Sequence, residues 1–215
     1  MNKRITIFLA SHNQHKLREI LEIANAVESQ DNASDILIDF VSFRNIGNHD
    51  NIFPPEETGK SFQENALIKL RAIPHSLSAD YFLAEDSGLM LPSLDGSPGI
   101  YSSRYAGENA SDSDNLDLLI KNIKKIPKEN RLAKYVCVMA LCNRKRQQEQ
   151  IFIGECTGKI ITEKKGTNGF GYDPCFWIQK FQKTMAELSS DIKNSISHRK
   201  AALQQVIHHI KFLEK

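Results

Sequence analysis

The sequence has little net charge, few cysteines and no long hydrophobic run. Its 28 basic and 26 acidic residues leave a formal charge of +2, so no overall field points to nucleic acid or an anionic membrane as a partner. The four cysteines include no C-x-x-C pair, which favours reduced, structural thiols. The apolar run Ile5 to Leu9 is too short for a signal peptide or a membrane span, so we expect a cytoplasmic protein.

The composition is that of an ordinary globular protein. Hydrophobic residues make up 40% and charged residues 25% of the 215 positions, which is enough to build a proper core. No internal repeat, low-complexity tract or linker divides the chain. We therefore expect a single domain over residues 1–215.

The first functional stretch follows a short buried strand. Ile5 to Leu9 is almost continuously apolar and β-branched, and the apolar spacing after Lys16 predicts a helix. Asn13 is a candidate N-cap, and a helix start beside Lys16 favours a phosphate. The alternative is an ordinary capped connection. His12 and His15 have no third ligand in view, so a zinc site is not favoured.

A second stretch places two carboxylates before another helix. Ser61 and Glu64 have capping-box spacing, and Pro74 ends the helix that they open. Glu56 and Glu57 lie just upstream, where the helix dipole stabilises acids in any case. Together with Asp86 they offer a second use, because phosphate-bound Mg²⁺ takes one or two protein carboxylates.

The third stretch is acidic and predicts a turn. Strand-like runs end at Ala84 and resume at Leu89, and they bracket Glu85 to Gly88. Turn chemistry alone would explain Asp, Ser and Gly at these positions. The alternative is that Asp86 projects beyond a strand end as a metal ligand or general base.

The second half predicts a helix near Leu116, with Ser111 or Asp112 as its cap. An antiparallel strand pair, Tyr135–Cys142 and Ile151–Ile153, is expected after it. The charges Arg144 to Arg146 are expected to solvate the turn between these strands, and a nucleic-acid patch there is not favoured. Thr184 and Glu187 repeat the capping-box spacing.

Two later stretches carry candidate substrate groups. Residues 164–173 are rich in glycine, and Phe170 and Tyr172 offer faces on which a base can stack. The alternative is a glycine-rich turn whose aromatic rings fold into the core. Lys193, His198 and Arg199 bring donors for a phosphate or a base carbonyl to a helix entrance, although a His-Arg pair on a solvated helix is common.

Five separated stretches now fit one family in the right order. They are Ala10-Ser11-His12-Asn13 with Lys16; Glu56-Glu57-Thr58-Gly59 with Phe62-Gln63-Glu64-Asn65-Ala66; Glu85-Asp86-Ser87-Gly88 with Pro98 to Gly107; Gly169-Phe170-Gly171-Tyr172-Asp173-Pro174; and Lys193 with Ser197-His198-Arg199. On these motifs the chain resembles the inosine triphosphate pyrophosphatase family, also called Ham1-like. The resemblance covers nearly the whole chain.

The resemblance implies an elongated two-lobed α/β fold, with a central mixed β-sheet flanked by helices and a nucleotide cleft between the lobes. It also implies Mg²⁺ dependence, a homodimer, and hydrolysis of noncanonical purine nucleoside triphosphates (ITP, dITP, XTP) to the monophosphate and pyrophosphate. Asp86 is then the catalytic proton acceptor, and Glu56 and Asp86 are the metal ligands. The implied substrate-binding residues are Ser11, His12, Asn13, Gln14, His15, Lys16, Ser87, Phe170, Gly171, Tyr172, Asp173, Lys193, His198 and Arg199.

Three positions depart from the family pattern. His15 and Lys200 stand where glycine is usual, and Glu85 stands where Asp is frequent. None removes an implied functional side chain. Two other readings stay open, namely a pyrophosphatase for modified pyrimidine nucleotides and a nucleotide sensor without turnover. Glu56 and Asp86 favour an enzyme, because carboxylates repel a bound phosphate unless a metal intervenes.

Overall fold

The computed structural model describes residues 3–30, 35–43 and 54–215. These residues form two compact units. The first takes its described residues from Met1–Asp86, Cys137–Gly154 and Arg199–Lys215, and the second consists of Ser87–Val136 and Glu155–His198. Each unit is therefore assembled from segments that are separated in the sequence.

The described residues contain seven strands and five α-helices. In chain order they are β1 (Lys3–Ala10), α1 (Gln14–Gln30), β2 (Ile36–Ser42), α2 (Phe62–Arg71), β3 (Tyr81–Met90), α3 (Asp112–Ile123), β4 (Leu132–Asn143), β5 (Gln148–Ile160), β6 (Phe176–Ile178), β7 (Lys183–Thr184), α4 (Ser190–Ile196) and α5 (His198–Leu213).

The strands form one mixed sheet in the order β2-β1-β3-β4-β5-β6-β7. β1 runs parallel to β2 and β3, and β6 runs antiparallel to β5 and β7. β4 and β5 are sheet neighbours joined only by residues 144–147, a connection too short for a parallel crossover, so they form the predicted antiparallel pair. The predicted α/β class with a central mixed sheet is confirmed.

Helix starts follow the predicted caps. The Ser61 hydroxyl accepts the N–H of Glu64, while the Glu64 carboxylate accepts the N–H of Lys60 rather than that of the cap residue. Ser111 and Asp114 form a complete capping box at the start of α3. Thr184 and Glu187 also form one, although it opens only a short 3₁₀ turn. Side-chain acceptors at these positions satisfy N–H groups that the helix itself leaves unpaired.

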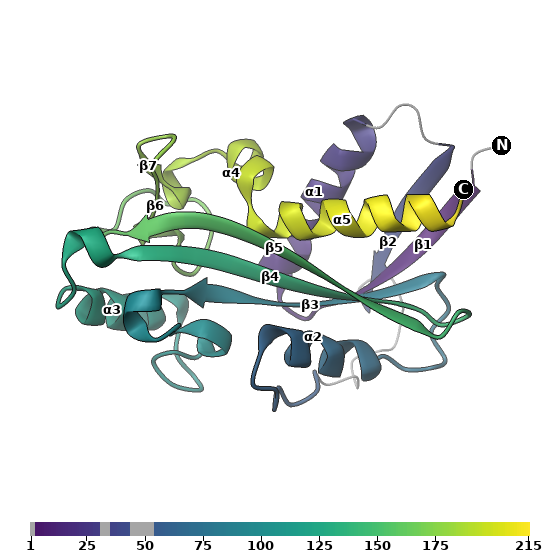
Figure 1. Cartoon of the computed structure of the whole chain (residues 1–215), viewed down its shortest axis with the longest axis horizontal. Helices are drawn as coiled ribbons and strands as arrows, with labels where there is room; N and C mark the ends of the chain where they lie inside the picture. Colours follow the sequence, from purple (N-terminus) through teal and green to yellow (C-terminus); the bar gives the residue numbers. More distant parts are fainter. Residues whose placement is uncertain (1–2, 31–34, 44–53) are drawn as a thin grey trace. The chain divides into compact units, whose positions relative to one another are not determined.

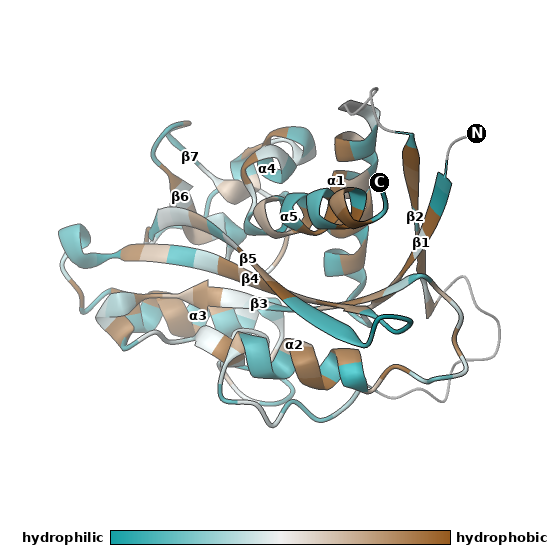
Figure 2. Ribbon diagram, turned by 45° about the vertical axis from the view of Figure 1, so that its right-hand side comes forward, coloured by the Kyte–Doolittle hydropathy of each residue, from teal (hydrophilic) through white to brown (hydrophobic). Residues whose placement is uncertain are grey.

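In the first unit, α1 and α5 cover one face of the sheet and α2 covers the other (Figure 1). The core beneath α1 and α5 joins Ile7 and Leu83 of the central strands to Ile20, Leu203 and other apolar residues of the two helices. Helices α1, α2 and α5 each carry both hydrophobic and hydrophilic residues in Figure 2, as expected for helices with one buried face. This packing fixes the start of α1 against the sheet.

The second unit has a separate core. Leu89 of β3, Leu119 of α3 and Phe176 of β6 are among its fully buried members, and Tyr135 of β4 and Met185 belong to the same cluster. In the part of the chain that the structure describes, no helix is both long and apolar enough to cross a membrane.

The structure corrects two expectations. Residues Glu85 to Gly88 do not form a turn, because β3 continues through them from Tyr81 to Met90. Arg144 does not simply solvate the β4–β5 turn. Its guanidinium lies 4.0 Å from the centroid of the Phe82 ring and donates to the carbonyl of Ile73, where α2 has just ended.

Candidate functional site

The candidate phosphate site lies at the start of α1. The Asn13 side chain accepts the N–H groups of His15 and Lys16 at 3.0 and 3.1 Å, which confirms the predicted cap. Ser11 follows the end of β1, and Gln14 and His15 are exposed in the first turn. The positive end of the helix dipole and the Lys16 ammonium together favour an anion here.

His12 is engaged in ring stacking. Its imidazole lies parallel to the Phe43 ring, with centroids 4.9 Å apart. Among the described residues no group of three or more His, Cys, Asp or Glu side chains is arranged to hold a metal.

Glu85 lies fully buried beside the start of α1. Its carboxylate is 3.0 Å from the Lys16 ammonium, and the Cys137 thiol lies 3.8 Å away. Burial opposes ionisation of Glu85, but Lys16, Arg199 and Lys69 outweigh it and lower the pKa of this carboxyl well below its usual range. Glu85 is therefore an ionised structural anion that positions Lys16. The same surroundings raise the pKa of the Cys137 thiol, mainly through burial, so this cysteine stays protonated.

Asp86 belongs to a different cluster. Its Oδ1 accepts from Lys69 of α2 at 2.8 Å, and Lys69 is also 2.9 Å from the Glu57 carboxylate. Burial raises the pKa of Asp86 although Lys69 and Lys16 oppose the shift. Burial alone would lower the pKa of Lys69, but Asp86, Glu85 and Glu57 outweigh it and raise it. The cluster thus holds two carboxylates around one charged lysine.

An asparagine connects this cluster to the loop before α2. Asn65 donates to Asp86 Oδ2 at 3.3 Å and accepts the Gly59 N–H at 2.9 Å. A Cβ on Gly59 would lie 2.5 Å from the Asn65 side-chain oxygen. Glycine is therefore required here, because only a bare backbone allows this close approach.

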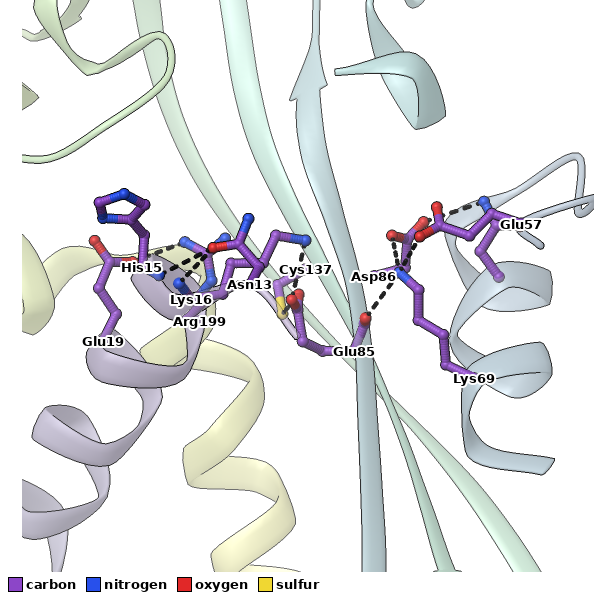
Figure 3. A network of polar contacts seen from close by, with 11 residues as sticks. Asn13, His15, Lys16, Glu19, Glu57, Lys69, Glu85, Asp86, Cys137 and Arg199 are labelled. Carbon is purple, nitrogen blue, oxygen red and sulfur yellow. Dashed lines mark hydrogen bonds and ion pairs between the residues drawn. The ribbon is translucent and has the colours of Figure 1, made fainter. Parts of the chain in front are cut away.

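Consecutive acids on β3 thus serve opposite faces of the strand. Figure 3 shows Glu85 with Lys16 and Cys137 on one side, and Asp86 with Lys69 on the other. Strand side chains alternate in direction, so two neighbours in sequence reach different surroundings.

The donor set around Asp86 fits a divalent cation. The carboxylates of Asp86 and Glu57 both contact the Lys69 ammonium, so they lie close to one common position. Carboxylate oxygens are the ligands that Mg²⁺ prefers. The partner carboxylate is Glu57. Glu56, the metal ligand expected from the sequence, is exposed.

Arg199 and His198 are consecutive but belong to different units. Arg199 forms a buried ion pair of 2.8 Å with Glu19 of α1, in the unit that holds Lys16. His198 lies in the second unit, where its imidazole stacks on the Tyr135 ring.

The glycine-rich stretch forms a loop organised by Asp173. The buried Asp173 carboxylate accepts the Phe170 N–H at 3.0 Å and pairs with Lys193 at 2.5 Å. The Lys193 ammonium lies 5.0 Å from the centroid of the Phe170 ring. Gly169 has a φ of +77°, and a Cβ there would collide with the Asp173 carboxylate. The structure thus brings the loop residues and Lys193 together.

Two further contacts fix this loop. Asp112 at the start of α3 accepts the Gly171 N–H at 2.9 Å. The Tyr172 hydroxyl donates to the carbonyl of Ser102 at 2.8 Å, so this ring is buried and only Phe170 remains partly accessible for stacking. Ser87 is half-buried on β3.

Comparison with known proteins gives the family. The model of the Ham1 family matches residues 7–209. The chain belongs to the Ham1 family. A dITP/XTP pyrophosphatase of Bacillus cereus is 37% identical over 93% of this chain and 92% of its own length, and one of Halalkalibacterium halodurans is 47% identical over 70% of this chain and 77% of its own.

Solved Ham1 structures share the fold. A HAM1 protein from Coxiella burnetii has a TM-score of 0.79 and 36% identity, with 96% of this chain and 98% of that chain covered. The Staphylococcus aureus Ham1 protein also has a TM-score of 0.79 and 36% identity, with 98% and 100% covered.

Three residues of this Ham1 chain were missed by sequence reasoning, namely Glu19, Lys69 and Tyr135. A signal existed for Lys69, because it follows Phe62 by seven positions and so interrupts the buried stripe of α2 with a charge. Glu19 carries a similar signal, since it precedes Ile23 of the buried face by four positions. A charge on an apolar stripe indicates a buried partner.

Proposed function

We propose that this Ham1 chain hydrolyses noncanonical purine nucleoside triphosphates, namely dITP, XTP and ITP, to the monophosphate and pyrophosphate. Family membership and the names of the relatives support the activity. The structural observation that carries it is the pair of clusters on β3, with Glu85 beside a cationic helix start and Asp86 in a carboxylate–lysine cluster.

In this proposal the start of α1 and Lys16 bind the triphosphate. Lys16 contacts Glu85 on one side, so its ammonium is held in place before any phosphate arrives. Lys193, which the family resemblance implies as a further substrate-binding cation, is likewise held in place, by Asp173. Preorganised cations stabilise the charge that develops on the leaving pyrophosphate without having to reorganise.

Mg²⁺ is the implied cofactor, and Asp86 and Glu57 are the carboxylates that would hold it. When bound, the ion supplies positive charge that neutralises the phosphates and polarises them. What supports Glu57 rather than Glu56 is the lysine that it shares with Asp86.

Asp86 acts as the general base. As the water oxygen forms its bond to the α-phosphorus, the water proton passes to the Asp86 carboxylate. The bond from the α-phosphorus to the bridging oxygen breaks, and pyrophosphate leaves. Burial raises the pKa of Asp86 toward the working pH, which favours a base of this kind.

The second unit binds the base. Phe170 stacks on it, and His198 or N–H groups of the loop donate to O6 of hypoxanthine or xanthine. Adenine carries an amino group at that position, which would leave the donors unpaired and lower the rate by up to about 10⁴-fold. The other substrate-binding residues expected from the sequence remain part of the proposal: Ser11, His12, Asn13, Gln14, His15, Ser87, Gly171, Tyr172, Asp173 and Arg199.

The test is a pyrophosphate-release assay with Mg²⁺ across ITP, dITP, XTP, GTP, ATP and modified pyrimidine triphosphates. We expect ITP, dITP and XTP to be cleaved far better than ATP, and GTP to be rejected less strongly than ATP. Equal turnover of ATP and ITP would contradict the O6-donor pocket. Preference for a pyrimidine would support the second pyrophosphatase reading, and binding without turnover would support a sensor.

The metal assignment has a matched pair of variants. Glu57→Gln should raise the Mg²⁺ concentration needed for half-maximal activity by about tenfold or more, because one of two carboxylate ligands is lost. Glu56→Gln removes the neighbouring exposed carboxylate and should leave that concentration unchanged. The reverse pattern would reassign the ligand to Glu56.

We also propose a homodimer, as the family resemblance implies. Light scattering coupled to size-exclusion chromatography should give twice the 24.4 kDa chain mass. A monomer mass at micromolar concentration would refute this part alone.

A further inference from the structure

Tyr135 of β4 lies at the centre of the second unit's polar network. Its side chain is buried, and its hydroxyl donates to Asp173 Oδ1 at 3.1 Å. Its ring lies parallel to the His198 imidazole, with centroids 4.9 Å apart and an interplanar angle of 13°. Phe176 packs on the Tyr135 ring at 4.5 Å. One side chain therefore contacts both a base-binding and a loop-organising residue.

The Tyr135 hydroxyl determines which partners each oxygen of the Asp173 carboxylate binds. Oδ1 accepts from Tyr135, which leaves Oδ2 directed at the Phe170 N–H and the Lys193 ammonium. Without the hydroxyl, one carboxylate oxygen would lose this buried donor, and the group would be able to rotate. The loop and Lys193 would then lose a fixed common anchor. A hydrogen bond to a charged group is worth more than one between neutral groups.

The ring has a separate role. Near-parallel stacking fixes the plane of the His198 imidazole, and the plane sets the direction in which its ring nitrogens point. A donor aimed at O6 discriminates between bases only if it cannot turn toward another acceptor. Removal of the ring would free the imidazole to rotate, and a rotating imidazole tolerates adenine better.

We propose that Tyr135 is a positioning residue with two separable roles: its hydroxyl orients Asp173 and thereby Lys193 for nucleotide affinity, and its ring orients His198 for discrimination between bases. This inference rests on the proposed function of the site. Tyr135 touches no reacting atom, and it acts only through Asp173 and His198.

The test compares Tyr135→Phe and Tyr135→Leu. Tyr135→Phe keeps the ring and loses the hydroxyl, so kcat/KM for ITP should fall about tenfold, KM should rise, and the ITP/ATP ratio of kcat/KM should stay unchanged. Tyr135→Leu also loses the stack, so that ratio should fall by about tenfold. The phenylalanine variant therefore rescues discrimination but not affinity.

Tyr105→Phe is the matched control. The Tyr105 hydroxyl accepts a hydrogen bond from Asn122 at 2.9 Å in the same unit, so its removal costs one hydrogen bond without touching Asp173. It should leave KM and the ITP/ATP ratio at wild-type values. A purely structural role for Tyr135 would lower all activities in proportion to the folded fraction, with KM and the ratio unchanged, and this result would overturn the inference.

A binding measurement separates this inference from the proposed function. Calorimetric titration with IMP and AMP needs no turnover. If the wild type does not hydrolyse ITP, the proposed function fails. The inference still stands if Tyr135→Phe weakens the binding of IMP and AMP equally while Tyr135→Leu narrows the difference in affinity between them. It fails if neither variant changes the binding of either ligand.

Discussion

Neutralising the two neighbouring acids of β3 should have opposite consequences for stability. Glu85→Gln removes the carboxylate from a pair with Lys16 in which the two side chains are only 1% and 16% exposed. Removing one partner of a buried pair typically costs about 3–5 kcal/mol, and we expect the lower end because the Lys16 ammonium keeps some access to water. A loss of about 3 kcal/mol would lower Tm by about 6–12 °C in a chain of this size.

Asp86→Asn should behave differently. Burial raises the pKa of Asp86, so the ionised carboxylate is less favourable in the folded state than in the unfolded chain. The amide removes that cost, and Lys69 keeps Glu57 as a partner at 2.9 Å. We expect Tm to stay constant or rise, while turnover falls by about 10²-fold or more because the general base is lost.

The stability contributions of the Glu85 and Asp86 carboxyl groups should depend on pH in opposite directions. The lowered pKa of Glu85 gives stability that is present above the ordinary value of 4.5 and is lost as the pH falls toward the lowered pKa. Glu85→Gln should therefore reduce the loss of stability in acid. The raised pKa of Asp86 gives stability that is present below the ordinary value of 3.8 and is lost as the pH rises through the raised pKa. Asp86→Asn should be most stabilising near neutral pH.

The assay is urea unfolding of both variants in EDTA, followed by pyrophosphate release from ITP with Mg²⁺. Metal-free conditions keep the comparison to the groups that the structure describes. Equal destabilisation of the two variants, or a larger loss for Asp86→Asn, would refute the assignment of the two acids to different surroundings. Normal turnover by folded Asp86→Asn would refute its role as the base.

Three further predictions concern the first unit. Lys16→Ala should weaken binding of the triphosphate much more than that of the monophosphate, and equal weakening of both by calorimetry would place Lys16 away from the outer phosphates. Arg144→Ala should cost about 2 kcal/mol or more by urea unfolding, because it removes charged donors from carbonyls after α2 and a contact with an aromatic ring, whereas exposed Lys145→Ala should be neutral. Tyr81 should ionise only near pH 12 in an ultraviolet titration, because burial and then the hydrogen bond to Glu214 raise its pKa to about 12, and Glu214→Gln should move this midpoint down.

Elements with strong periodicity were predictable from the sequence. β1 and α1 were found because a β-branched run, a polar loop and a helical spacing follow one another around Asn13. The capped starts at Ser61 and Ser111 were found for the same reason, since cap chemistry is local. Family motifs then supplied the loop near Phe170, which periodicity alone left ambiguous.

What the sequence did not reveal depends on contacts between distant segments. Glu85 and Asp86 were expected in a turn because Asp, Ser and Gly are typical turn residues, and the sequence does not show that their compensating lysines come from α1 and α2. Arg144 was expected in solvent because the sequence around it shows no partner. Its aromatic partner, Phe82, lies on another strand. The family resemblance implied Glu56 as the metal ligand, but the residues alone do not separate Glu56 from Glu57, since both precede α2 and only the fold shows which one reaches Lys69.

Because each unit is assembled from segments that are separated in the sequence, the parts of one core leave the ribosome at different times. The core of the first unit combines Ile7 from the first strand with Val206 and Ile210 from the last helix, so this unit cannot complete its packing until α5 has been made. Every segment of the second unit precedes Arg199, at the start of α5, and is available earlier. Lys3 and Glu214 are joined by a 2.6 Å ion pair, so the start of β1 lies beside the residues that follow α5, within reach of a short linking peptide. A circular permutant opened in the exposed turn at Lys145 would make α5 before β1, which reverses the order in which the two halves of this core leave the ribosome.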